Sequence, residues 1–84
     1  MNRKQRKTIN EAFGGMLHIS RIERKITQRD LSELAGITDV YLRKMESGGS
    51  TATWIIWLEL CTALEIDIQS LQRKYIVPEL DNKL

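Results

Sequence analysis

The side chains that could do covalent or metal chemistry are few in this 84-residue chain. It has one cysteine, Cys61, and one histidine, His18. A single thiol cannot form an internal disulfide, and one thiol with one imidazole cannot supply the ligands of a zinc site. No motif brings together a nucleophile, a base and an oxyanion donor. We therefore expect neither an enzyme nor a metal or cofactor site. Cys61 is predicted to lie in the core, and His18 to be exposed and inert.

The chemistry that the sequence does favour is electrostatic, because its charges are unevenly distributed. The net charge is +2, but residues 1–26 carry seven Lys and Arg against Glu11 and Glu23, a balance of +5. Residues 27–48 carry three basic against four acidic side chains, and residues 49–84 three against five. Such a basic segment is typical of an arm or face that meets a polyanion, and also of a solvated tail. Charge alone leaves both interpretations open.

One compact domain is the expected organisation. A chain of 84 residues, 42% of them apolar, can bury one core but not two. Its longest apolar run, WIIWL at 54–58, is far shorter than the ~20 residues that cross a bilayer. The segment after the basic start contains a Glu and two Gly and does not make a signal-peptide core. We expect a cytoplasmic protein.

A first helix is expected over residues 10–25, where apolar residues recur near helical spacing. It contains Gly14 and Gly15. A Gly within a helix costs about 1 kcal/mol relative to Ala, so the pair is best explained by a segment that packs closely there. The basic residues before position 10 are predicted to form a mobile arm, since nothing apolar anchors them to the core.

Two helices follow with clear start and stop signals. Thr27 is a good N-cap, and Asp30 stands in the capping-box position. Gly36 can take a positive φ and ends this helix. Thr38 caps the next one, with Asp39 in its first turn, where its charge suits the helix dipole. Gly48-Gly49 ends it. The residues predicted to face inward are Leu31, Leu34 and Ala35 on the second helix, and Leu42 and Met45 on the third.

A fourth helix is expected from Trp54 to Leu64, capped by Thr53 after the loop GGSTA at 48–52. A short fifth helix can start at Asp67 and run to about residue 75. The predicted inward stripe of the fourth helix is Trp54, Trp57, Leu58, Cys61 and Leu64, and such a stripe is more often core than cofactor site.

Pro78 should prevent much extension of the fifth helix, so the last residues, PELDNKL, are predicted to form a frayed or partner-bound tail. We therefore divide the chain into a basic N-terminal arm (1–9), a helical domain (10–77) and a C-terminal tail (78–84).

The break between the second and third helices is very short, because only Gly-Ile and one capping Thr separate them. So few residues cannot reverse the chain and keep both apolar faces on one core, and the helices must cross at a large angle. Ala35 is small where they approach, and Ile37 can fill the corner. In a helix-turn-helix of this kind the first helix braces across the DNA backbone and the second enters the major groove. A helical corner in any small bundle has the same spacing, which leaves both interpretations open.

Several segments taken together resemble the phage-repressor and Cro-like helix-turn-helix domains. The pattern runs through TQRDLSELAGIT and VYLRKMESG, and extends to FGGMLHISR and WLELCTALEID. The resemblance covers about residues 12–71. It implies an all-α fold, a compact five-helix bundle of the lambda-repressor-like type, and binding to double-stranded DNA.

The resemblance also implies roles for individual residues. Gln28 would hydrogen-bond a phosphate, aided by the N-terminal amides of its helix. Positions 39, 40 and 44 match those that most often read bases: Lys44 can donate to guanine, and Val40 can contact a thymine methyl. Arg43 and Ser47 can also bind phosphates. The predicted DNA-binding residues are Gln28, Thr38, Asp39, Val40, Tyr41, Arg43, Lys44 and Ser47.

Two of these residues depart from the family pattern. Asp39 brings negative charge to the DNA, where it would either accept from cytosine N4 or serve only as a helix-start residue. Tyr41 is large at a commonly small site, and would wedge against a base or sugar or lie over the second helix. Arg21 and Glu46 match a family pair that links the first helix to the end of the third, which implies a structural role.

The expected function is sequence-specific transcriptional regulation, by a repressor that binds a near-palindromic operator as a homodimer. Ile55 and Ile56 are apolar where the helix pattern expects polar residues, and residues 66–80 carry more apolar groups than one small core needs. An overfilled core is the alternative explanation. The rival functions are a protein-interaction module, as in an antitoxin or antirepressor, and the DNA-binding part of a longer regulator.

Overall fold

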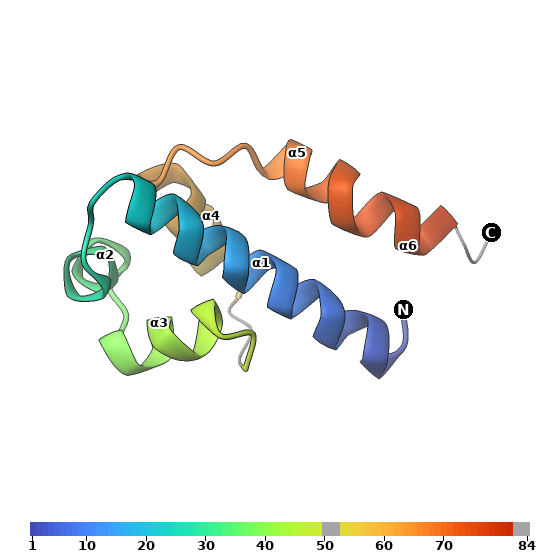
Figure 1. The fold of residues 1–84 in the computed structure, drawn as a ribbon, viewed down its shortest axis with the longest axis horizontal. Helices are drawn as coiled ribbons and strands as arrows, with labels where there is room; N and C mark the ends of the chain where they lie inside the picture. The colour runs from blue at the N-terminus through green and yellow to red at the C-terminus, as the bar shows by residue number, and fades with distance from the viewer. Residues whose placement is uncertain (50–52, 82–84) are drawn as a thin grey trace.

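Helices account for most of the chain in the computed structural model, which describes residues 1–49 and 53–81 (Figure 1). The predicted all-α class is confirmed. No helix in these two ranges is long and apolar enough to cross a membrane. In chain order the elements are α1 (Arg3–Glu23), α2 (Gln28–Ala35), α3 (Asp39–Glu46), α4 (Trp54–Ala63), α5 (Ile68–Leu71), the π-helical turn η1 (Gln72–Ile76) and α6 (Val77–Asp81).

Helix α1 begins well before the predicted start near residue 10. Asn2 caps it, since its Oδ1 accepts from the Gln5 amide at 2.8 Å while Gln5 Oε1 accepts from the Asn2 amide at 2.9 Å. Ile9 is buried and anchors this stretch. The prediction of a mobile, unanchored segment was therefore wrong: the basic side chains of residues 3–7 lie on a helix. Their separation from the domain as a functional arm stays a prediction.

The core lies where α1, α2, α3 and α4 meet. Leu34, predicted to face inward, is 68% exposed, because α2 turns its buried face at Leu31 and Ala35 toward the other helices. Leu42 and Met45 are fully buried, as predicted. The buried cluster consists of Leu17, Leu31, Ala35, Leu42, Met45, Leu60 and Leu64.

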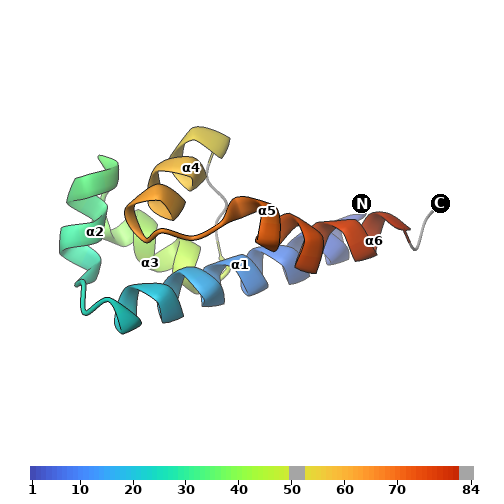
Figure 2. The same ribbon diagram turned by 90° about the horizontal axis from the view of Figure 1, so that it is seen from above.

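Helix α4 contributes less of its length to this core than its apolar stripe predicts. Trp54 is 71% exposed and Leu58 39% exposed, so their placement in the core was wrong. The buried residues lie in the second half of the helix, at Leu60 and Cys61, and at Leu64 just after it. Figure 2 gives the reason, because the N-terminal end of α4 points away from α1. Trp57 is half-buried, with its ring 5.7 Å from that of Phe13.

The chain stays helical beyond the point where Pro78 was expected to stop it. Asp67 caps α5 by accepting from the Gln69 amide at 3.0 Å, as predicted. The Val77 N–H then bonds Gln72 O across a π-helical turn, and Pro78 falls in the first turn of α6, where its missing N–H is tolerated. The predicted fraying was therefore wrong for residues 78–81. Residues 50–52 of the GGSTA loop and 82–84 of the tail lie outside the described residues.

The two ends of the chain run side by side. Figures 1 and 2 both show the N-terminal half of α1 beside α5, η1 and α6. Gln5 Nε2 donates to Glu79 Oε2 at 2.9 Å, and the rings of Phe13 and Tyr75 lie 5.7 Å apart. This extension of the bundle lies at the end opposite the corner between α2 and α3.

Candidate nucleic-acid interface

The corner between α2 and α3 is built by local caps. Thr27 Oγ1 accepts from the Asp30 amide at 3.0 Å, and Thr38 Oγ1 accepts from the Tyr41 amide at 3.0 Å. Gly36 ends α2 with a φ of 67°, and Ile37 packs against the core as predicted. In Figure 1, α2 is seen nearly end-on while α3 lies across the view, so the two helices cross steeply. The predicted short break is confirmed.

Helix α3 presents an open face at the edge of the molecule (Figure 1). Its buried residues are Leu42, Met45 and Glu46. The helical period therefore turns the remaining positions outward, and most of the predicted DNA-binding residues lie there. The exposed members of that set are Thr38, Asp39, Val40, Arg43, Lys44 and Ser47.

Intramolecular contacts already engage part of this face. Arg43 Nη2 lies 3.7 Å from Asp39 Oδ2, one helical turn away, and this exposed pair offsets the negative charge that Asp39 brings. Ser47 Oγ donates to Lys44 O at 2.9 Å. Tyr41 is half-buried and packs against the core, which favours the interpretation that it lies over the neighbouring helix.

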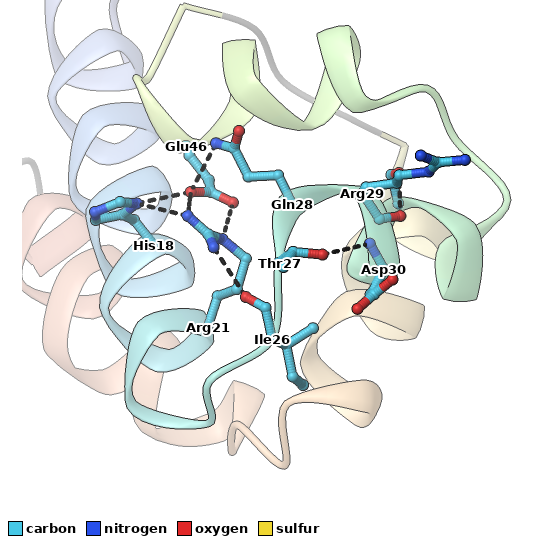
Figure 3. Close-up of polar contacts among 9 residues, drawn as sticks. His18, Arg21, Ile26, Thr27, Gln28, Arg29, Asp30 and Glu46 are labelled. Carbon is cyan, nitrogen blue, oxygen red and sulfur yellow. Dashed lines mark hydrogen bonds and ion pairs between the residues drawn. The ribbon is translucent and has the colours of Figure 1, made fainter.

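A polar cluster around the Glu46 carboxylate, which we call the Glu46 cluster, joins α1, α2 and α3 (Figure 3). Arg21 Nε and Nη2 donate to the two carboxylate oxygens at 2.9 and 3.1 Å, which confirms the predicted pair. Arg21 Nη1 also donates to Ile26 O at 2.9 Å. His18 Nδ1 lies 2.7 Å from Glu46 Oε1, and Gln28 Nε2 donates to the same oxygen at 3.4 Å. The prediction that His18 is inert was therefore wrong.

The Glu46 carboxylate is held ionised. Burial alone would raise its pKa, but the hydrogen bonds from Arg21, His18 and Gln28 and the charge of Arg21 outweigh that, and the pKa of Glu46 is lowered. An ionised carboxylate can only accept hydrogen bonds, so the short contact places a proton on Nδ1 of His18. The Glu46 carboxylate thus links the end of α3 to α1 and to the first residue of α2.

The close approach of α1 and α3 depends on Gly14. A Cβ on this residue would overlap the carbonyl oxygen of Met45 and come within 2.9 Å of that of Glu46. A Cβ on Gly15 would meet nothing within 4 Å. The predicted close packing is therefore confirmed for Gly14 alone, and it sets the distance of the exposed α3 face from the rest of the fold.

The structure brings Gln28 together with Arg43 and Ser47, which sequence separates. These three residues, with His18 and Glu46, line a shallow open depression of about 310 Å³ between α1, α2 and α3. His18 is the member that sequence reasoning missed. Its position three residues before Arg21, on the same face of one helix, is the signal that could have placed it beside the predicted Arg21 and Glu46 pair.

Comparison with known proteins agrees with this geometry. A family model described as helix-turn-helix matches residues 17–71, more than half of the chain. Among solved structures, the clp gene regulator ClgR from Corynebacterium glutamicum has a similar fold, with a TM-score of 0.73, 24% sequence identity, and coverage of 80% of this chain and 71% of that one. No curated protein has a significantly matching sequence. The chain belongs to the Cro/C1-type helix-turn-helix family of DNA-binding transcription regulators.

Proposed function

We propose that this regulator is a cytoplasmic transcriptional repressor that binds a near-palindromic operator as a homodimer. The observation that carries the proposal is the open face of α3, whose two ends are fixed by the Thr38 cap and by the Glu46 cluster. A helix held at both ends can present its side chains to base edges in a defined orientation.

In this proposal α3 lies in the major groove. Lys44 and Val40 contact base edges, guanine and a thymine methyl respectively, and both are exposed. Asp39 accepts from cytosine N4 or remains paired with Arg43. Phosphate contacts come from Gln28 and from positions 43 and 47, which share one depression. The 3.4 Å bond from Gln28 to Glu46 is the longest in the Glu46 cluster, so the Gln28 amide can turn to a phosphate at small cost.

Exposed apolar residues support the homodimer. Ile55 is 51% exposed on α4 beside Trp54 at 71%, and such neighbouring apolar side chains are typical of an interaction surface. A depression of about 360 Å³, lined mainly by apolar and aromatic residues including Trp54, Leu58 and Ile76, adjoins them. We assign the interface to this face of α4. Two recognition helices placed by it would read half-sites about 34 Å apart.

The base-reading assignment is tested by binding-site selection on random duplexes. Lys44→Ala should relax the preference at one base position, with a loss of about 1–3 kcal/mol, while Gln28→Ala should weaken all sequences about equally. Retention on DNA should fall steeply with salt, which a protein-interaction module would not show. If the Lys44 variant selects the wild-type sequence unchanged, Lys44 does not read bases.

The dimer is tested by sedimentation of Ile55→Glu. A charge at this position should shift the protein toward monomer and weaken operator binding without unfolding it, because a monomer occupies only one half-site. Ile22→Glu on α1 is the matched control, since Ile22 is 54% exposed, and it should leave the association state unchanged. An unchanged dimer in the Ile55 variant would move the interface elsewhere, with Val77 the next position to test.

A further inference from the structure

His18 has one ring nitrogen committed and one available. Nδ1 lies 2.7 Å from Glu46 Oε1, whereas among residues 1–49 and 53–81 no group hydrogen-bonds Nε2. Arg21 Nη2 lies 3.3 Å from Nδ1, but a guanidinium only donates, so it does not compete for the Nδ1 proton. The side chain is 51% exposed. Glu46 therefore fixes the tautomer of His18 and leaves Nε2 as the atom that can meet a ligand.

The residues around His18 form a site suited to a phosphate. The charged groups that face it are Arg21 on its own helix and Glu46 and Arg43 on α3, while α2 contributes the neutral amide of Gln28. Arg21 neutralises Glu46 through two hydrogen bonds, which leaves Arg43, whose Nη2 lies 3.7 Å from Asp39 Oδ2 in an exposed pair, as the remaining cation of the depression. Its other polar groups are the Gln28 amide and the Ser47 hydroxyl, whose proton is donated to Lys44 O. Arg43 and the Gln28 amide are the groups that can donate to an anionic oxygen.

We propose that His18 is a further DNA-contacting residue: its Nε2 takes up a proton from solvent and donates to the backbone phosphate held by Gln28 and Arg43, so that DNA affinity depends on pH. This rests on the proposed DNA-binding face. A neutral imidazole turns only a lone pair on Nε2 toward the phosphate, and two acceptors cannot bond. An imidazolium donates a charge-assisted hydrogen bond instead. Only the ring with protons on both nitrogens can donate to Glu46 and to a phosphate at once, so binding tightens as pH falls.

Fluorescence anisotropy of a labelled duplex, recovered by the binding-site selection above, measures the effect at fixed ionic strength from pH 6 to 8. Wild-type affinity should fall by roughly fivefold per subunit across this range, the size expected of a solvent-screened ion pair. His18→Gln should bind at every pH about as the wild type does at pH 8. His18→Lys, which keeps a charge, should bind about as tightly as the wild type at pH 6, with no dependence on pH.

Two results overturn the inference: a wild type whose affinity is independent of pH, or a His18→Gln variant that keeps the wild-type pH dependence. His18 also bonds Glu46, so its variants are expected to melt lower than the wild type. Melting of each variant at both pH values shows that it is fully folded in the assay, and a pH dependence of affinity between fully folded proteins reports DNA contact rather than stability. If His18→Gln does not fold, the Lys variant decides alone, and a wild-type pH dependence in it contradicts the proposal. A wild type that binds no duplex at any pH would instead refute the proposed function.

Discussion

Replacing Gly14 with Ala should separate the effect of helix propensity from that of helix packing. In an isolated helix the change stabilises by about 1 kcal/mol, because Ala restricts the unfolded chain. Here the new Cβ would overlap Met45 O and stand 2.9 Å from Glu46 O. Both are backbone atoms on α3, so neither can move aside as the end of a flexible side chain could.

The magnitude follows from these two opposed terms. Overpacking of a well-filled interior costs about 1–3 kcal/mol, and a clash with backbone belongs at or above the upper end. Subtracting the gain in propensity leaves a net loss of about 2 kcal/mol, which for a domain of this size lowers the melting temperature by roughly 8–16 °C. Gly15→Ala is the matched control. Nothing lies within 4 Å of its Cβ, so the gain of about 1 kcal/mol should raise the melting temperature by roughly 4–8 °C.

Thermal unfolding followed by circular dichroism, with urea titration as a second probe, measures both variants. Shifts of opposite sign are expected at these two adjacent positions of one helix. This expectation is refuted if Gly14→Ala melts as high as Gly15→Ala, since α1 and α3 would then not approach each other at Gly14. A Gly14 variant that stays folded should also bind operator more weakly, because the displaced α3 no longer meets the groove in register.

Further outcomes are expected at the Glu46 cluster and at the start of α1. Arg21→Ala and Glu46→Ala should each lose about 3–5 kcal/mol of stability and the double variant less than the sum, because each single change strands a buried charge; additive losses in urea titrations would mean that the two do not interact. Folding lowers the pKa of Glu46. Its contribution to stability is therefore full above the ordinary glutamate pKa of 4.5 and is lost as pH falls through the lowered pKa. Acid titrations of the wild type and Glu46→Gln should converge below the lowered pKa. Replacing the four basic side chains of residues 3–7 with Gln should flatten the salt dependence of DNA binding, reducing the slope of log K against log salt by about 0.9 for each phosphate that these side chains neutralise, while leaving the helix intact; an unchanged slope would mean that this part of α1 does not touch DNA.

The features that could be predicted from sequence are those whose physics is local. The caps at Thr27 and Thr38 and the stop at Gly36 each depend on a few neighbouring residues, and all three form as expected. Local signals also failed in three places. Thr53 stands at the N-cap of α4, but its side chain makes no capping hydrogen bond. The Asn2 cap was not predicted, because the basic residues after it show no apolar period. The rule that Pro ends a helix failed at Pro78, because a π-helical turn precedes it and the chain stays helical.

Burial along a helix could not be predicted in the same way. An apolar period identifies a face, but where neighbouring helices cross decides how much of that face is covered. Trp54 and Leu34 belong to apolar faces and are nevertheless exposed, since no neighbouring helix in the described part of the chain covers them. The same distinction between local and tertiary signals applies to the candidate site. The outward face of α3 follows from its period, whereas the meeting of His18, Gln28 and Arg43 needs three helices in place.

The π-helical turn between α5 and α6 makes the meeting of the two chain ends depend on an exact count of residues. Its bond from Val77 N–H to Gln72 O spans one residue more than an α-helical bond does. Each residue of an α-helix turns the next by about 100°. Deleting one residue here would only restore α-helical spacing, whereas deleting one from α6 before Glu79 would rotate Glu79 by about that angle and carry it away from Gln5. A one-residue length change between η1 and Glu79 would thus be felt at the N-terminal cap of α1, at the opposite end of the sequence.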